Sequence, residues 1–305
     1  MRDVIIIGSG PAGMGAAIYG KRAGLDTLII EKTGFSGGQI TNTYEVDNYL
    51  GLPGVDGYEM AMNFRSHVDK LGADFEEGEV HRVRREADTL YVETASGSYE
   101  TKTVIIASGA SHSKLGIPGE EELSGMGVSY CATCDGAFFR GKTTAVVGGG
   151  DVAVEDAIFL ARSCEKVYLI HRRDQLRAAK ILQESLLQLP NVEVIWDSVA
   201  EEITGEGKVE ALRIKNVKTG ETRSLPLQGV FIAVGIKPST VPFRGLVDMD
   251  EKGYIMAGED CCTSEPGIFV AGDCRRKELR QIITAVADGA NAVNSIQRYL
   301  VEAGL

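Results

Sequence analysis

The chain repeats one strand–turn–helix pattern at two places 140 residues apart. The first copy reads VIIIGSGPAG at residues 4–13, and the second reads AVVGGGDVA at residues 145–153. In both, a β-branched run ends in a glycine turn, and a segment with helical spacing and a second apolar run follow, as in a parallel βαβ unit. The turn positions correspond in pairs, with Gly8, Gly10 and Gly13 matching Gly148, Gly150 and Ala153. We therefore predict an α/β protein with two Rossmann-like, doubly wound dinucleotide-binding domains.

The two copies differ where their second strand ends. The first places Glu31 there, and a carboxylate at this point accepts hydrogen bonds from ribose hydroxyls. The second places His171 at the matching position, followed by Arg172, Arg173 and Arg177, and guanidinium groups bind a 2′-phosphate through charge-assisted hydrogen bonds. We expect the first turn to take a dinucleotide with free ribose hydroxyls and the second to take NADP(H). The alternatives are a turn without a ligand for the first copy and a solvated basic helix start for HRRDQLR.

A third element, IFVAGD at residues 268–273, is expected to complete the first site. A strand ending in Gly272-Asp273 can aim a carboxylate at a ribityl or ribose hydroxyl, and the start of the following helix can face a flavin carbonyl. Helical patterns cover roughly 57–71, 175–189 and 280–300, and residues 34–57 are expected to form an extended functional loop. Further strand candidates are Leu90–Thr94, Thr103–Ala107, Val192–Trp196, Ala211–Val217 and Val230–Val234.

Cys131 and Cys134 form a CxxC pair shortly before the second glycine turn. Two thiols at this spacing can close a small disulfide, and their surroundings can lower one thiol's pKa so that it attacks as the thiolate. Half of a zinc site is the main alternative, but it needs a second pair or nearby histidines, and the four histidines are not clustered. The other alternative is a buried cysteine pair that has no redox role. We favour a redox pair and expect the remaining four cysteines to be structural, with Cys274 close to Asp273.

Charge and hydropathy narrow the class of partner. Lys and Arg number 32 against 43 Asp and Glu, for a formal net charge of −11, so nucleic acid is not an expected partner. No apolar run reaches the ~18 residues of a membrane helix, and the run Val4–Ile7 is too short for a signal peptide. We expect a cytoplasmic protein that does not bind membranes.

In this order, the motifs GSGPAG, GGQI, CATCDG, GGGDVAVEDA, HRRDQLR and AGDCRRKELRQ resemble those of the bacterial low-molecular-weight thioredoxin reductases, over essentially the whole chain. The resemblance implies a homodimer with FAD, NADPH as reductant and oxidised thioredoxin as substrate. It also implies an NADPH-binding domain, residues 115–240, inserted into an FAD-binding domain made of residues 1–114 and 241–305. Crossings are expected near Ser113–Pro118 and Lys237–Pro242, as hinges for a rotation of the inserted domain.

The resemblance also implies the roles of individual residues. Cys131, Cys134 and Asp135 are implied as catalytic, with Cys134 nearer the flavin and Asp135 as the acid–base group; which cysteine forms the mixed disulfide stays open. Gln281 is implied to face the isoalloxazine. The implied FAD site consists of Gly8, Gly10, Pro11, Ala12, Gly13, Glu31, Lys32, Gly38, Gln39, Asn48, Gly272, Asp273, Arg280 and Gln281. The implied NADPH site consists of Gly148, Gly150, Asp151, Ala153, Arg172, Arg173 and Arg177.

Three positions depart from the family pattern. Ser108 stands where relatives commonly carry Thr, and Cys274 replaces an apolar residue. Asp151 stands where Asn or Glu is common, and an acid beside a pyrophosphate is unfavourable unless it points away. Two other functions stay open: a flavoprotein of this architecture that reduces another disulfide protein, such as one serving a peroxiredoxin, and a nucleotide-sensing flavoprotein without turnover. The first usually carries an additional thioredoxin-like region, which does not fit before Val4, and the cysteine pair argues against the second.

Overall fold

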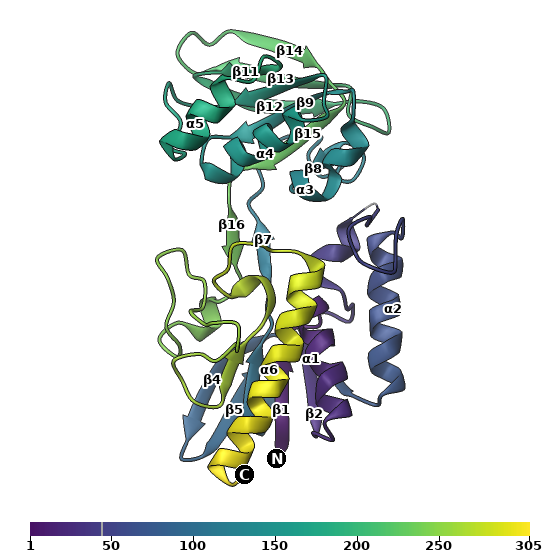
Figure 1. The fold of residues 1–305 in the computed structure, drawn as a ribbon, viewed down its shortest axis with the longest axis vertical. Helices are drawn as coiled ribbons and strands as arrows, with labels where there is room; N and C mark the ends of the chain where they lie inside the picture. Colours follow the sequence, from purple (N-terminus) through teal and green to yellow (C-terminus); the bar gives the residue numbers. More distant parts are fainter. Residues whose placement is uncertain (44) are drawn as a thin grey trace. The chain divides into compact units, whose positions relative to one another are not determined.

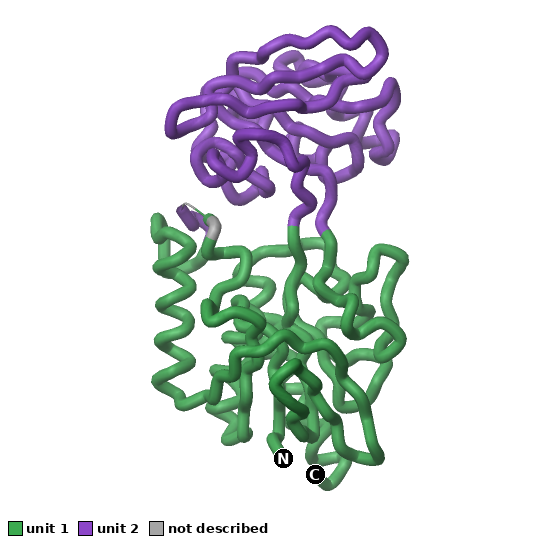
Figure 2. The backbone as a smooth tube through the Cα atoms, turned by 180° about the vertical axis from the view of Figure 1, so that it is seen from behind, with its two compact units in different colours: residues 1–43, 49–111, 237–305 green, residues 44–48, 112–236 purple. Residues whose placement is uncertain are grey.

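The computed structural model describes residues 1–43 and 45–305, and the chain forms two compact units. The first unit comprises Met1–Thr43, Tyr49–Ser111 and Lys237–Leu305, and the second is mainly His112–Ile236 (Figure 2). The strands β7 (Ala110–His112) and β16 (Ile236–Pro238), which pair with each other, carry the chain across the two boundaries (Figure 1). The second unit is thus an insertion into a discontinuous first unit.

The first unit is built on a seven-stranded sheet in the order β3-β2-β1-β6-β5-β4, with β17 beside β6. Its parallel strands are β1 (Arg2–Ile7), β2 (Thr27–Glu31), β3 (Asp74–Glu77), β6 (Gly97–Ile106) and β17 (Ile268–Val270). The antiparallel strands β4 (Val80–Glu86) and β5 (Thr89–Thr94) extend it beyond β6. Val4–Ile7 is buried throughout, because a central parallel strand is covered on both faces.

Three α-helices belong to this unit: α1 (Pro11–Arg22), α2 (Gly57–Lys70) and α6 (Ile282–Ala303). Short 3-10 turns are η1 (Gly38–Asn42), η3 (Val241–Phe243) and η4 (Gly272–Cys274). Helices α1 and α6 lie side by side (Figure 1), and a Cβ added at Gly289 of α6 would lie 2.3 Å from the carbonyl oxygen of Ala12 in α1. This close backbone approach brings the start of α6 to the first glycine turn.

The second unit has a parallel sheet in the order β11-β10-β9-β15-β8. These strands are β8 (Val128–Ser129), β9 (Thr143–Gly148), β10 (Lys166–Ile170), β11 (Val192–Ile195) and β15 (Gly229–Ala233). A separate antiparallel sheet consists of β12 (Ser198–Thr204), β13 (Ala211–Asn216) and β14 (Thr222–Pro226). The helical segments are α3 (Ala132–Asp135), η2 (Gly136–Phe139), α4 (Asp151–Ala161) and α5 (Lys180–Leu187). No helix within the described residues is both long and apolar enough to span a bilayer.

The predicted fold class is confirmed, and each predicted strand overlaps a strand of the two units, although those at 103–107, 192–196, 211–217 and 230–234 were predicted one residue too long. One helix prediction is partly wrong: the pattern at 175–189 predicts a helix from residue 175, but α5 begins at Lys180. The Gln175 carbonyl oxygen instead lies 2.9 Å from Nε2 of His171, and the Ala179 N–H donates to Asp151. These backbone groups are therefore not available to a helical hydrogen-bond ladder. The loop predicted at 34–57 holds η1. No strand is predicted from the sequence where β3, β4, β7, β8, β12, β14 and β16 lie.

Candidate active site

The first glycine turn connects β1 to α1. Gly8 has φ +106°, and a Cβ there would lie 2.5 Å from the Ala107 carbonyl oxygen, so only glycine fits. Gly10 has open space where a Cβ would be, which leaves its backbone accessible to a ligand. The Glu31 carboxylate reaches back to this turn, accepting from the N–H of Ser9 at 2.7 Å and from its hydroxyl at 2.8 Å. Glu31 therefore stabilises the turn through these two hydrogen bonds, which we call bracing the turn, and it also lies where a ribose is expected.

The GGQI segment and the AGDC segment both lie against this turn. The Gly37 N–H donates to the Ser9 carbonyl at 2.9 Å, and a Cβ at Gly38 would lie 3.6 Å from the Gly10 Cα. A Cβ at Gly272 would lie 2.8 Å from the Ala12 Cβ. Chain segments from three parts of the sequence therefore meet at one place. Asn48 is different, because residues 45–48 group with the second unit.

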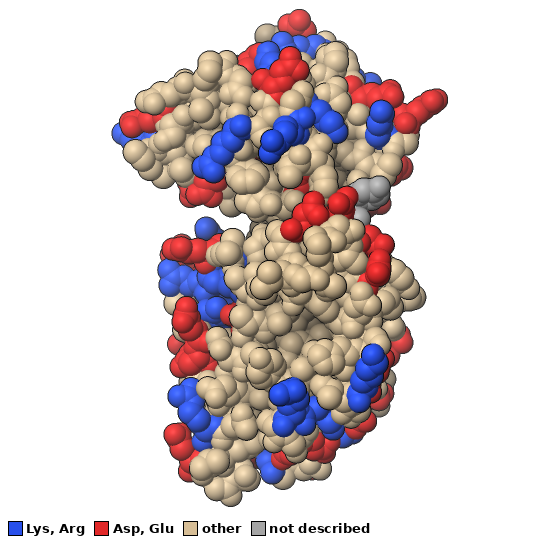
Figure 3. Space-filling model, turned by 45° about the vertical axis from the view of Figure 1, so that its right-hand side comes forward, with Lys and Arg blue, Asp and Glu red and all other residues tan. Residues whose placement is uncertain are grey.

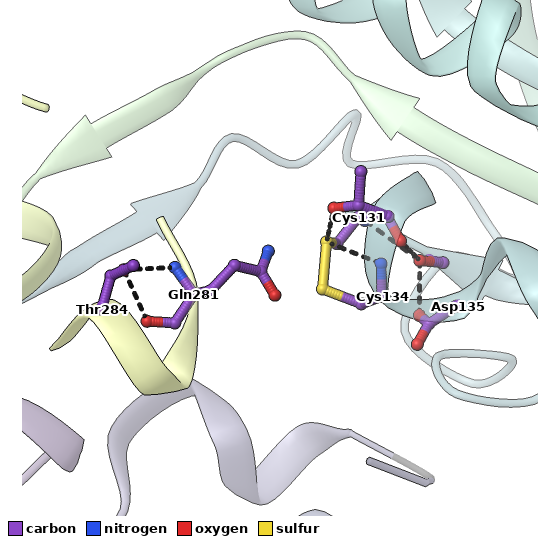
Figure 4. The surroundings of a disulfide bond; sticks show 7 residues. Cys131, Cys134, Asp135, Gln281 and Thr284 are labelled. Carbon is purple, nitrogen blue, oxygen red and sulfur yellow. Dashed lines mark hydrogen bonds between the residues drawn. A yellow bond between two sulfur atoms is a disulfide. The ribbon is translucent and has the colours of Figure 1, made fainter. Parts of the chain in front are cut away.

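Asp273 carries one of the unsatisfied buried polar atoms of the described residues. Its Oδ1 is buried and has no hydrogen-bond partner within the described residues, and burial raises the pKa of its carboxyl. Arg280 follows on the same segment and donates from Nε to the Asp273 carbonyl at 3.4 Å. Gln281 begins α6, in a reciprocal capping arrangement with Thr284 (Figure 4). An orphaned carboxylate oxygen beside an open glycine turn fits a ligand that brings hydroxyl groups, as FAD does.

The second glycine turn connects β9 to α4 and has the same construction. A Cβ at Gly148 would lie 2.5 Å from the Ala233 carbonyl oxygen, and Gly150 has open space in place of a Cβ. His171 is buried, and its ring nitrogens Nδ1 and Nε2 each lie 2.9 Å from a carbonyl oxygen, of Gly148 and Gln175 respectively. A Cβ at Gly149 would lie 2.1 Å from Nδ1, so the ring occupies the space that a side chain would need.

The three arginines of the second site are exposed. Across residues 1–43 and 45–305, no hydrogen bond or ion pair is recorded for the guanidinium groups of Arg172, Arg173 and Arg177. Unpaired guanidinium groups beside an open glycine turn suit the 2′-phosphate of NADPH. The Asp151 carboxylate is hydrogen-bonded: its Oδ1 accepts from the Ala179 N–H at 2.8 Å.

The CxxC pair is joined as a disulfide, with the two Cα atoms 5.3 Å apart, and lies at the start of α3 (Figure 4). Ser129 organises the loop: its hydroxyl accepts from the Cys131 N–H at 3.0 Å and donates to the Asp135 carboxylate at 2.6 Å. Burial raises the pKa of Asp135, and the Ser129 hydroxyl opposes this shift. A half-buried carboxyl group next to Cys134 is therefore placed to keep a proton at higher pH than an exposed one.

The other cysteines are free thiols. Cys164, Cys261 and Cys274 are buried, and burial raises the pKa of Cys261 to about 12 and that of Cys274 to about 11. The Cys274 thiol donates to the carbonyls of Ile106 and Ala271, both at 3.4 Å, so it packs inside the first unit. In the described part of the chain, no group of three His, Cys, Asp or Glu side chains could hold a metal ion.

Sequence reasoning missed several residues that organise these sites. Ser9 and Ser129 are examples, because a serine in a turn carries no signal of the long-range partner that its hydroxyl will find. Asp288 is another: this buried residue of α6 accepts from the Gly272 N–H at 2.9 Å, from Arg275 at 2.8 Å and from Lys277 at 2.7 Å. An acid in the middle of an Ala-rich helix could have indicated this ion-pair cluster.

Comparison with known proteins agrees with this geometry. Residues 2–289 match the model of the pyridine nucleotide-disulphide oxidoreductase family. The thioredoxin reductase of Listeria innocua is 48% identical over 301 residues, covering 98% of this chain and 94% of its own, and that of Bacillus subtilis is 46% identical, covering 98% and 95%. The crystal structure of thioredoxin reductase from Streptococcus pyogenes superposes with a TM-score of 0.96 at 48% identity, covering 99% of both chains.

The chain therefore belongs to the pyridine nucleotide-disulphide oxidoreductase family. Within that family it belongs to the thioredoxin reductases, which are FAD- and NADPH-dependent oxidoreductases.

Proposed function

We propose that the chain reduces the disulfide of oxidised thioredoxin, with electrons passing from NADPH through FAD and the Cys131–Cys134 disulfide. One observation carries this proposal: a closed CxxC disulfide lies beside a half-buried carboxyl, in the unit that also holds the second glycine turn and its arginines. A dinucleotide-binding unit with its own dithiol–disulfide pair can supply both the reductant and the thiols for disulfide exchange.

The first glycine turn is proposed as the FAD site and the second as the NADPH site, with the boundaries near residues 114 and 240. The open Gly10 backbone, the braced Glu31 carboxylate and the orphaned Asp273 oxygen support FAD at the first. The open Gly150 backbone and the exposed arginines support NADPH at the second. Further residues proposed at the FAD site are Pro11, Ala12, Gly13, Lys32, Gly38, Gln39, Asn48, Gly272, Arg280 and Gln281, and at the NADPH site Gly148, Asp151 and Ala153.

The chemistry divides between the cofactors and the cysteine pair. When bound, FAD supplies a two-electron carrier between a hydride donor and a disulfide. The Cys131–Cys134 disulfide takes up two electrons and two protons and becomes two thiols, and Asp135 provides a proton next to Cys134. One thiolate of the pair then attacks the thioredoxin disulfide, and the other breaks the mixed disulfide. The Cys131–Cys134 bond forms again, and thioredoxin leaves as a dithiol.

A homodimer in the cytoplasm is the setting that we propose. The exposed positions of α6 between Ile283 and Gln297 are uncharged, and Figure 3 shows a broad area without charged residues on the first unit, in the lower part of the view. Depletion of charge is typical of the core of an interface between copies of a chain. Sedimentation of the purified protein tests the dimer, and the mass of a single chain would contradict it.

The function is tested by NADPH oxidation with oxidised thioredoxin as the acceptor. We expect Cys134→Ser and Cys131→Ser each to abolish thioredoxin reduction while NADPH still reduces the bound flavin, because only the disulfide step needs both sulfurs. Cys164→Ser is the matched control, since Cys164 is a buried free thiol in the same unit, and it should keep its activity. Near wild-type thioredoxin reduction by Cys134→Ser would show that the pair is structural.

A further inference from the structure

The segment that carries the three arginines, residues 171–179, is fastened to the second glycine turn by its own backbone and by a buried ring. The Arg177 N–H donates to the Gly149 carbonyl at 2.7 Å. The His171 ring lies against the same turn, with Nδ1 2.9 Å from the Gly148 carbonyl oxygen. These contacts join the start and the middle of the arginine segment directly to the turn. The turn and the arginines thus form two lobes of one site, and their spacing decides which ligands can reach both.

The exposed side chain of Asp151 makes a third contact between the turn and the arginine segment. Asp151 is the first residue of α4, and its Oδ1 accepts from the N–H of Ala179 at 2.8 Å. The bond joins the start of the helix to the far end of the arginine segment. It also gives the carboxylate two opposite effects on a bound nucleotide. Its charge repels a nearby phosphate, whereas its hydrogen bond holds the arginine segment in place.

We propose that Asp151 is a positioning residue whose bond to the Ala179 N–H, together with the contacts of Arg177 and His171, sets the spacing between the second glycine turn and the three arginines. The proposal rests on the assignment of NADPH to this site. The substrate class that depends on Asp151 is a nucleotide with phosphates on both its 2′ and 5′ sides, because only such a ligand needs both lobes at a fixed distance. The positioning effect outweighs the repulsion. Asp151 therefore favours NADPH binding, although its carboxylate and the phosphates are both negatively charged.

Three adenosine phosphates separate the two effects. In this site 2′-AMP reaches the arginines, 5′-AMP reaches the glycine turn, and 2′,5′-ADP reaches both. Loss of the Asp151 bond frees the far end of the arginine segment, while the Arg177 and His171 contacts still hold the rest of it. The spacing then varies over a wider range, so 2′,5′-ADP loses affinity and the two monophosphates do not. Loss of the charge alone would instead tighten every ligand whose phosphate lies near the turn.

The experiment measures binding of the three ligands to the full-length, FAD-loaded protein by calorimetry, with competition for the weak ones. We expect Asp151→Ala to weaken 2′,5′-ADP about three- to tenfold, the range expected for one hydrogen bond, and to change the monophosphates less than about twofold. Asp151→Asn keeps an oxygen that accepts from Ala179 and removes the charge, so it should bind 2′,5′-ADP at least as tightly as wild type. Val152→Ala, at the next exposed position of α4, is the matched control and should bind as wild type does.

Several results would overturn the role of Asp151. Unchanged or tighter 2′,5′-ADP binding by Asp151→Ala would mean that repulsion dominates. Equal weakening by Asp151→Asn would mean that the charge matters and the bond does not. Equal weakening of all three ligands would mean general damage to the turn. Arg172→Ala and Arg173→Ala test the NADPH assignment separately: if neither weakens 2′,5′-ADP, the proposed function of this site fails. If the arginine variants do and Asp151→Ala does not, only the role of Asp151 fails.

Discussion

The two glycine turns have glycines at corresponding positions and differ in the residue that contacts the turn from the end of the second strand. Gly8 and Gly148 approach a carbonyl of a neighbouring strand in the same way, and Gly10 and Gly150 both leave their backbone open. At the end of the second strand, however, the first turn is braced by a carboxylate and the second by an imidazole ring. The same position therefore supports the turn and sets the charge that a ribose or its phosphate will meet.

In each turn, the residue at the end of the second strand fits the residue that follows the first glycine of the turn. Glu31 accepts two hydrogen bonds from Ser9, whereas the His171 ring fills the space above Gly149, the residue that corresponds to Ser9. A histidine at position 31 would meet the Ser9 side chain, and a carboxylate at position 171 would find no hydroxyl at Gly149. An exchange of the residues at positions 31 and 171 therefore requires a matching change at positions 9 and 149.

The largest effect that we predict concerns the disulfide step, which follows nucleotide binding at both turns. Asp135→Asn should slow thioredoxin turnover by roughly 10²-fold, the contribution of a positioned acid, while NADPH and FAD bind as before. Burial raises the pKa of Asp135, so its protonated form persists to higher pH than in an exposed aspartate. Wild-type turnover should fall as pH rises through that pKa, and the variant should lose this limb. Equal pH profiles for the two proteins would contradict the role of Asp135.

A smaller effect distinguishes the two turns directly. Gly149→Ala places a Cβ 2.1 Å from the His171 ring, so the ring must move, and we expect at least about tenfold weaker 2′,5′-ADP binding with unchanged FAD content. Ser9→Ala is the matching change in the first turn. It removes one hydrogen bond and keeps the Ser9 N–H bond to Glu31, so FAD affinity should fall only severalfold. A Gly149→Ala protein that binds 2′,5′-ADP normally would show that the packed ring is not required.

The smallest effect concerns the helices behind the turns. Asp156 of α4 corresponds to the buried Ala16 of α1, and burial, together with Glu155, raises the pKa of Asp156 to about 7. The folded state therefore holds a proton that the unfolded chain releases near pH 4. The stability that this proton contributes is complete below about pH 4 and is lost as pH rises to about 7.

Asp156→Asn should accordingly raise the melting temperature by a few degrees at pH 7 and change it little at pH 4. Glu155→Gln is the matched control: Glu155 is the exposed neighbour, and its removal should give a smaller gain. A difference between Asp156→Asn and wild type that stays constant from pH 4 to 7 would contradict a raised pKa for this half-buried carboxyl.

Local sequence patterns were sufficient for the parts of the molecule that depend on local structure. Both glycine turns, their flanking strands and the CxxC turn follow from residue types at short spacing, and the structure contains them all. The irregular stretch at 175–179 could not be predicted, because it depends on a bond from Ala179 to Asp151, 28 residues away in the sequence. The brace between Ser9 and Glu31 and the role of Asp288 were missed for the same reason. The sheet β12–β14 was only partly predicted, since its strands are short and alternate weakly.

The central claim is that the two sites take different dinucleotides because of the charge at the end of the second strand. The most direct test measures the Michaelis constants for NADPH and NADH in the double variant Arg172→Ala/Arg173→Ala. Loss of charge-assisted hydrogen bonds to the 2′-phosphate predicts a constant for NADPH at least about tenfold higher and a constant for NADH that is nearly unchanged. Equal changes for the two nucleotides would contradict the claim, because NADH has no 2′-phosphate for these arginines to bind.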